Sequence, residues 1–153
     1  MKNKSLKNIW TLICFCTLTL YSAQCKKINF LIMIDEQPCV LAYDVEINST
    51  SMSSIEAKYT VGTIDFSDEN YNRFINDKSQ NFELSFRTFL PKSSLPNKYI
   101  ISIPKNFLNQ EFIIIDIFNK GNKLYKKRYS GVNKNSKKEY YVVMSTRNAM
   151  KFD

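Results

Sequence analysis

The 153-residue chain contains no histidine, so it lacks the side chain that most often acts as a general base near neutral pH. A Ser-His-Asp or Cys-His catalytic site and a zinc site of the Cys/His kind are therefore excluded. Glycine is also scarce: only Gly62, Gly121 and Gly131 occur, and they lie far apart. A dinucleotide fingerprint and a P-loop both need clustered glycines, so neither motif is present.

Long apolar runs are missing as well. The run from Ile9 to Tyr21 has about 13 residues, whereas a membrane-spanning helix needs ~20. Three lysines precede it, and the small residues Ser22 and Ala23 follow. This layout predicts a secretory signal peptide over residues 1–23, and a membrane anchor is the alternative.

A second form of export is indicated by Cys25. The sequence Ser22-Ala23-Gln24-Cys25 resembles a bacterial lipobox, in which the cysteine is lipidated, although Gln24 stands where Gly, Ala or Ser is usual. With either form of processing the mature chain begins near residue 24. We therefore expect a periplasmic, outer-membrane-associated or secreted protein whose formal charge falls from +8 to +5 with the loss of three lysines.

Residues 24–153 are expected to form a single all-β domain, because apolar and polar side chains alternate along much of the chain. One short helix is expected after Ser67, with Tyr71, Phe74 and Ile75 on one face. Short strands at intervals of about ten residues favour an antiparallel β-sandwich of the immunoglobulin or transthyretin type, with a small β-barrel as the alternative. The strands are expected near residues 28–34, 41–47, 55–66 (with a bulge or bend at Gly62), 82–86, 99–103, 112–118, 124–129 and 140–144.

The two cysteines of the mature chain, Cys25 and Cys39, test one part of this arrangement. If residues 28–34 and 41–47 form a tight hairpin, the cysteines lie roughly 30 Å apart at ~3.3 Å per residue. A disulfide requires Cα atoms within about 7 Å. The hairpin and the disulfide therefore exclude each other, unless the strands belong to different sheets or Cys25 folds back.

The segment from Phe112 to Phe118 is almost entirely apolar and is expected at the centre of a sheet, with Asp116 in need of a polar partner. A turn at residues 119–122 is expected to return the chain into the strand at 124–129. Residues 147–153 are expected to form a tail or half-turn.

Charge is distributed unevenly along the mature chain. Residues 24–97 hold 7 basic and 10 acidic residues, whereas residues 98–153 hold 12 basic and 4 acidic ones. Such a basic segment could dock an anionic partner: a protein, lipid headgroups or acidic glycans. Nucleic acid is not expected as a partner of an exported protein. The alternative is an edge hairpin whose lysines prevent strand addition by other chains. The candidate residues are Lys120, Lys123, Tyr125, Lys126, Lys127, Arg128, Tyr129, Lys134, Lys137 and Lys138.

Two other sequence patterns resemble functional motifs but do not indicate a site. Asp65, Asp68 and Glu69 lack the spacing of a calcium loop, and helix N-terminal charge complementarity accounts for the last two. Ser102 to Lys105 spells S-x-x-K, but Pro104 and the absence of its partner motifs indicate a chance match. We expect no metal, no cofactor and no catalytic residue.

Three functions remain open after these exclusions. The first is a non-catalytic exported binding or accessory module, and the second is an inhibitor or immunity-type protein that blocks a partner enzyme. The third is a small exported hydrolase that uses paired carboxylates, because the 10 acidic residues of residues 24–97 could supply such a pair.

Overall fold

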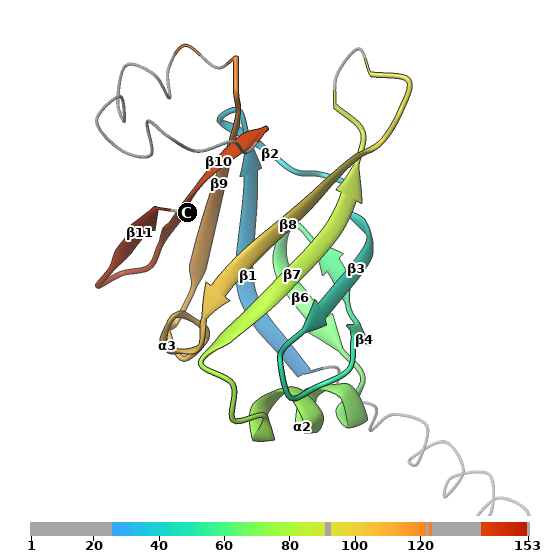
Figure 1. Cartoon of the computed structure of the whole chain (residues 1–153), viewed down its shortest axis with the longest axis vertical. Coiled ribbons are helices and arrows are strands. Elements are labelled where there is room, and N and C mark those ends of the chain that lie inside the picture. The colour runs from blue at the N-terminus through green and yellow to red at the C-terminus, as the bar shows by residue number, and fades with distance from the viewer. Residues whose placement is uncertain (1–25, 91–92, 122, 124–138, 153) are drawn as a thin grey trace, which may run out of the picture.

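The structure, a computed structural model, describes residues 26–90, 93–121, 123 and 139–152. Over this part of the chain two β-sheets enclose one hydrophobic core (Figure 1). The large sheet contains, in spatial order, β11 (Met150–Phe152), β10 (Tyr140–Ser145), β9 (Ile113–Asn119), β1 (Lys26–Ile34), β6 (Gly62–Phe66) and β5 (Lys58–Thr60), and the short β2 (Gln37–Pro38) pairs with β1. The small sheet contains β4 (Ile55–Glu56), β3 (Tyr43–Asn48), β7 (Asn81–Thr88) and β8 (Asn97–Pro104).

The expected all-β class is confirmed, but the expectation of purely antiparallel pairing is wrong. The small sheet is antiparallel, whereas β1 and β9 run parallel in the large sheet, with Phe30 opposite Ile113 and Ile34 opposite Ile117. An apolar run looks the same in a buried parallel strand and a buried antiparallel one, so the sequence could not reveal this difference. No closed barrel forms among the described strands.

Residues 28–34 and 41–47 do not form a hairpin with each other, because they belong to different sheets, which was one of the alternatives left open. β1 instead turns into β2 through Asp35 and Glu36, whose φ angles of 50° and 69° are those of a tight two-residue hairpin turn. Beyond this turn the Cys39 amide donates to the Ile32 carbonyl at 2.8 Å. Ile32 lies six residues, roughly 20 Å, from Lys26 along β1, so the described strand still separates Cys39 from the neighbour of Cys25. Cys25 itself lies outside the described residues.

Gly62 produces a reversal of the chain, not the bulge or bend that we expected. Its φ of +93° suits a turn, and Thr60 lies opposite Thr63 in the β5–β6 hairpin. The run before it is divided between the sheets, since β4 pairs with β3 and β5 pairs with β6. This segment therefore connects one edge of the small sheet to one edge of the large sheet.

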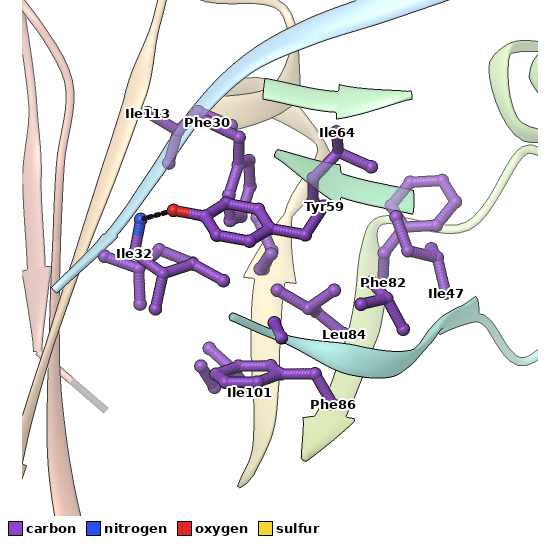
Figure 2. Packing of buried hydrophobic residues seen from close by; sticks show 14 of the residues in the cluster. Phe30, Ile32, Ile47, Tyr59, Ile64, Phe82, Leu84, Phe86, Ile101 and Ile113 are labelled. Carbon is purple, nitrogen blue, oxygen red and sulfur yellow. Dashed lines mark hydrogen bonds between the residues drawn. The ribbon is translucent and has the colours of Figure 1, made fainter. Parts of the chain in front are cut away.

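Alternation along the strands builds the core. The inward side chains of β7, β8 and β9 are almost fully excluded from solvent, and Tyr59 reaches across to accept a hydrogen bond from the Ile32 amide at 3.1 Å (Figure 2). Strand β9 lies inside the large sheet between β1 and β10, which confirms the central position expected for residues 112–118. Asp116 has an interaction partner, as expected for a charged group in such a strand.

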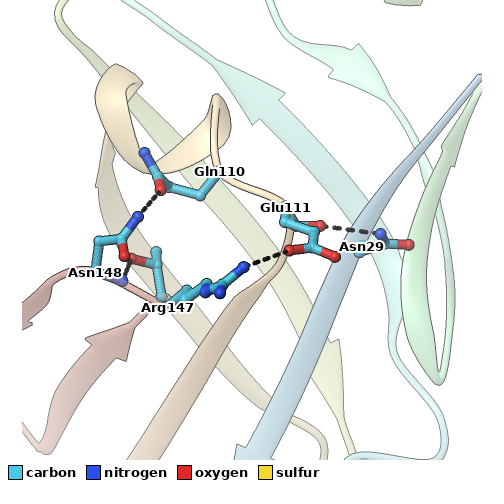
Figure 3. Close-up of polar contacts among 6 residues, drawn as sticks. Asn29, Gln110, Glu111, Arg147 and Asn148 are labelled. Carbon is cyan, nitrogen blue, oxygen red and sulfur yellow. Dashed lines mark hydrogen bonds and ion pairs between the residues drawn. The ribbon is translucent and has the colours of Figure 1, made fainter.

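Strand β9 was expected to turn at residues 119–122 into a strand at residues 124–129. Its two edges are occupied by β1 and β10, and Asn119 lies opposite Tyr140. Residues 124–129 lie outside the described part of the chain. The tail or half-turn expected after residue 147 is a strand, because β11 pairs with β10 and places Met150 opposite Ser145. Polar contacts hold the β10–β11 turn to the segment before β9, including Arg147–Glu111 at 3.8 Å and Asn148–Gln110 at 3.4 Å (Figure 3).

Helix α2 (Asp68–Asn76) begins as expected, but Ile75, expected on one face with Tyr71 and Phe74, is 50% exposed. The Ser67 hydroxyl accepts from the Asn70 amide at 3.2 Å, and Phe74 is buried. A second short helix, α3 (Lys105–Leu108), was not expected, and it begins directly after Pro104. Four residues are too few for helical periodicity to be recognised in the sequence.

Tyr140 protects the free edge of β8 in the small sheet. Its hydroxyl accepts from the Ile100 amide at 2.7 Å and donates to the Ile100 carbonyl at 2.8 Å. Both backbone groups point away from β7, and they would otherwise be open to strand addition. A side chain of the large sheet therefore occupies the middle of this edge.

Candidate binding surface

The basic residues singled out from the sequence begin at one end of the molecule. Lys120 and Lys123 are exposed at the end of β9, and the Lys120 amide donates to the Glu139 carbonyl at 3.0 Å. The chain thus leaves β9 and returns to β10 at the same place (Figure 1). The other candidates lie outside the described residues: Cys25, Tyr125, Lys126, Lys127, Arg128, Tyr129, Lys134, Lys137 and Lys138.

An apolar groove of about 600 Å³ lies at this same end. It is formed by the β1–β2 turn, the connection from β2 to β3 and the segment that follows β7. The Thr88 hydroxyl joins two of these segments by donating to the Leu41 carbonyl at 2.6 Å. The lining residues are Ile34, Asp35, Gln37, Pro38, Cys39, Val40, Leu41, Thr88, Phe89 and Leu90.

Large apolar side chains of this end face solvent. Val40 is 77% exposed, Leu41 61% and Phe89 52%, and Leu95 in the connection from β7 to β8 is 74% exposed. Single exposed apolar residues are common on proteins, but contiguous ones around a groove mark an interaction site. Leu41 was expected on the apolar face of a strand over residues 41–47, but β3 begins at Tyr43 and Leu41 is exposed in the connection before it. An apolar residue at the end of an alternating pattern looks the same whether it continues the strand or lines a groove beside it.

A polar network fixes the floor of this end. The Asp35 carboxylate accepts from the backbone amide and side-chain amide of Asn119 at 3.0 and 2.7 Å. The Tyr99 hydroxyl donates to Asn119 Oδ1 at 3.2 Å, and Tyr99 contacts Tyr140 with ring centroids 4.9 Å apart. Burial raises the pKa of Tyr99 to about 12, so the network is neutral at this position at physiological pH. Through Asp35 and Asn119, this network joins the β1–β2 turn, whose residues have positive φ angles, to the end of β9, where the basic segment begins.

Cys39 is a packing residue within the groove wall. It is 5% exposed, and its thiol donates weakly towards the Leu41 carbonyl at 3.5 Å. Burial raises the pKa of Cys39, which disfavours the reactive thiolate.

The remaining sequence candidates are accounted for locally. Asp68 and Glu69 lie in the first turn of α2, and Asp65 forms a 3.8 Å ion pair with Lys27. No group of three or more metal-ligating side chains gathers within the described residues. Lys105 donates to the Asp77 carbonyl, so its ammonium group has a structural partner in place of the Ser102 hydroxyl.

Two carboxylates do face each other elsewhere on the molecule. Glu46 of β3 lies directly opposite Glu56 of β4, and both line a second groove, of about 350 Å³, on the outer face of the small sheet. Neither residue was singled out from the sequence, because they are ten residues apart and only the strand register brings them together.

The chain matches no protein-family model, no curated protein and no solved structure. None of the helices described here has the length and apolar character needed to span a membrane. The interpretation of function therefore rests on the two grooves and on the charge distribution.

Proposed function

We propose that this protein is an exported, non-catalytic binding module of the cell envelope or the secreted fraction, and that it docks an acidic partner protein. The observation that carries the proposal is the shared position of the apolar groove and of Lys120, where the basic segment begins. An acidic segment with apolar side chains would place those side chains in the groove and its carboxylates against the lysines. Charge complementarity of this kind accelerates encounter, and apolar burial supplies affinity.

A protein partner is favoured over the membrane by the placement of the N-terminal side of the domain. Lys26 begins β1 opposite Phe66, whereas Ile34, which lines the groove, ends β1, nine residues or roughly 30 Å away. If Cys25 carries the lipid, the groove points away from the membrane that holds the protein. If residues 1–23 are cleaved as a signal peptide, the same surface is free in solution.

The export part of the proposal is tested by mass spectrometry of protein recovered outside the cytoplasm. We expect a mature chain that begins at Gln24, or one that begins with a diacylglycerol-modified Cys25. An intact Met1 on the exported protein would contradict the signal peptide.

The docking part is tested with a labelled synthetic peptide of alternating Glu and Leu, and its binding to the mature protein is measured by fluorescence anisotropy. We expect binding that weakens at least about tenfold between roughly 0.05 and 0.5 M salt, because exposed charges are screened over ~10 Å at 0.1 M. A Lys/Leu peptide should not bind. A Glu/Ser peptide should bind more weakly, since it cannot fill the groove.

Charge reversal provides the matched control. Reversal of Lys123, Lys126, Lys127 and Arg128 to Glu should abolish binding of the Glu/Leu peptide. The same change of net charge at four positions away from this end should leave it intact; these are Lys26, Lys58, Lys78 and Lys151. Equal binding by both variants would overturn the docking surface. Binding of phosphatidylglycerol vesicles or polygalacturonate in place of the peptide would identify the partner as lipid or glycan instead of protein. Aggregation of the first variant with unchanged binding would support edge protection.

A hydrolase with paired carboxylates is the second candidate, and the Glu46–Glu56 pair is the observation in its favour. Cross-strand neighbours have Cβ atoms about 5 Å apart, which is compatible with the separation of carboxyl groups in retaining glycosidases. However, none of the residues described as lining this groove is aromatic, so a sugar ring has no stacking surface there. Glycosidase activity that is lost in both Glu46→Gln and Glu56→Gln would favour the hydrolase over the binding module.

If the acidic partner is itself an enzyme, an assay of that enzyme in the complex distinguishes an accessory module from an inhibitor or immunity-type protein. We further propose that the architecture is related in kind to sandwiches of the immunoglobulin or transthyretin type, with the parallel β1–β9 pair as its departure from them.

A further inference from the structure

We propose that the groove on the outer face of the small sheet, the charged groove, binds a dipeptide with a free amino terminus and a free carboxyl terminus. This inference does not depend on the proposed docking function, because the charged groove and the apolar groove share no lining residue. The side chains that carry the argument are Glu46, Glu56, Ser85, Arg87 and Lys98, together with Asp44.

The charged groove contains two rows of like charge. Glu46 lies opposite Glu56 in one row, and Arg87 lies opposite Lys98 in the other. Like charges directly opposite each other across two strands destabilise a sheet. A ligand with one positive and one negative group would relieve the repulsion in both rows.

Glu56 and Lys98, which lie on the outer strands β4 and β8, have no ion-pair partner in the part of the chain that the structure describes. Both residues are exposed. The inner two are held in position: Glu46 accepts from the Ser54 hydroxyl at 3.0 Å, and Arg87 lies 3.4 Å from Asp44. Each row therefore combines one fixed charge with one that is available to a ligand.

A hydroxyl group lies at the floor of the charged groove. Ser85 is on the central strand β7, opposite Glu46, and only 6% of the residue is exposed. No hydrogen bond of its hydroxyl is found among the described residues, although it lines the groove. The Ser85 hydroxyl oxygen reaches the open space of the groove, so it is available to a polar atom of a ligand, such as the peptide carbonyl or amide.

The backbone is distorted beside this floor. The register of β3 against β7 shifts between Tyr43 and Glu46, and Asp44 within the irregularity has a φ of 50°. Bulges and left-handed non-glycine residues are concentrated near binding and active sites. Here the irregularity places the Asp44 carboxylate beside Arg87, which orients the guanidinium group in the basic row.

The spacing of the rows selects the length of the ligand. Ser85, which lies opposite Glu46, and Arg87 are two residues apart on β7, so Glu46 and Arg87 are diagonal neighbours on adjacent strands, roughly 7–8 Å apart. Glu56 and Lys98 lie one strand further out on either side. Two residues of extended peptide span about 7 Å, whereas a single amino acid spans about half of that. An extended dipeptide would thus lie diagonally, with its ammonium at Glu46 and its carboxylate at Arg87. The exposed side chains of Glu56 and Lys98 would reach these two groups from the outer strands β4 and β8.

The test is a calorimetric titration of the mature protein with Ala-Ala and three relatives, each of which lacks one feature. Acetyl-Ala-Ala has no ammonium, Ala-Ala amide has no carboxylate, and alanine is too short to span the rows. We expect Ala-Ala to bind and each relative to bind at least about tenfold more weakly, a change of ~1.4 kcal/mol. Absence of Ala-Ala binding, or equal binding of all four compounds, would overturn the proposal.

Variants of similar size without the charge show which end of the dipeptide each row binds. Glu56→Gln should weaken Ala-Ala and leave the residual binding of acetyl-Ala-Ala unchanged, whereas Lys98→Met should weaken Ala-Ala and leave that of Ala-Ala amide unchanged. Glu83→Gln is the matched control, because Glu83 lies on the same strand as Ser85 but does not line the groove. Both site residues are exposed, so melting temperatures should remain close to that of the parent. Parent-like Ala-Ala binding in Glu56→Gln and Lys98→Met would refute the assignment.

Discussion

The connections at the two ends of this molecule use their side chains differently, although the α2 end also exposes Ile75 beside a smaller groove of about 150 Å³. At the end that carries α2, polar side chains satisfy one another: Ser67 caps the helix, and the Asp77 carboxylate accepts hydrogen bonds from Ser49 and Ser51 at 3.1 and 2.7 Å. At the other end, Val40 and Leu41 expose apolar surface next to a turn with two left-handed residues. The same two sheets support both ends, so the difference arises from the connections alone.

This contrast separates structural from interacting surface. The Asp77 cluster holds the β3–β4 connection to the segment between α2 and β7, and Ser51 and Ser79 also lie 2.8 Å apart within it. Its hydrogen-bonding groups are used within the protein. The apolar groove leaves favourable contacts unmade, and they become available when a partner covers it. Substitutions at the first end should therefore alter stability, and substitutions at the second should alter binding.

The largest effect should come from the strand that runs between the two ends. Ile115 on β9 is fully buried, so Ile115→Asp would place an unpaired charge in the core and should abolish soluble folding. Solubility and circular dichroism provide the measurement. Ile114→Asp, on the other face of the same strand where the side chain is only half-buried, is the control and should be much less damaging. A melting temperature of Ile115→Asp equal to that of the parent would show that neither end depends on this core.

A smaller loss is expected from the polar end. Asp77→Asn removes an acceptor of the Ser49 and Ser51 hydroxyls and should lower the free energy of unfolding by about 1–3 kcal/mol. The measurement is urea denaturation. Asp68→Asn, in the exposed first turn of α2, should cost less than about 1 kcal/mol through the helix dipole. Equal losses in the two variants would contradict the structural role given to the Asp77 cluster.

The pH dependence of the free energy of unfolding should reflect the ionisation of Asp77. Burial alone would raise the pKa of Asp77, but hydrogen bonds from Ser51, Ser79 and Ser49 outweigh it and lower the pKa from 3.8 to about 2. Because the folded-state pKa is depressed, the stabilisation is fully present above the unfolded pKa and is lost as pH falls through about 2. Asp77→Asn should reduce the loss of stability between about pH 4 and pH 2, measured by denaturation at each pH. An unchanged acid transition would show that other carboxylates govern it.

The smallest effect on stability is expected at the groove end. Val40→Asp and Leu41→Asp alter exposed side chains and should change the free energy of unfolding by less than about 0.5 kcal/mol, while binding of the Glu/Leu peptide is lost. Val61→Asp is the matched control, since Val61 is 47% exposed at the β5–β6 turn, outside the groove lining. It should bind the peptide like the parent. A destabilisation of several kcal/mol in Val40→Asp would make the groove end a structural element like the opposite one.

Local patterns were sufficient wherever one segment decides its own structure. The alternation around Phe82 and Phe86 predicted β7, and the apolar run from Ile113 to Ile117 predicted a central strand. The cap at Ser67 predicted the start of α2. In each case burial of a side-chain row or one hydrogen bond to a neighbouring amide is encoded within a few residues.

Pairing between distant segments was beyond such reasoning. Nothing in the alternation of β1 distinguishes a neighbour at residue 113 from one at residue 47, so the parallel β1–β9 pair was missed and the placement of β1 and β3 in different sheets stayed an open alternative. The candidate basic residues could be identified from composition, whereas the apolar groove beside them could not. Its walls come from three connections that are far apart in the sequence.

By itself, the sequence of this protein determined the absence of histidine chemistry, the excess of positive charge after residue 97, the β class and the positions of most strands, because composition and period are local properties. The tertiary structure alone decided which strands are neighbours, that Glu46 faces Glu56 across β3 and β4, and that the apolar groove and Lys120 share one end. The physical reason is that register and packing depend on the whole core. Residues with no relation along the chain acquire a common function only once that core has formed.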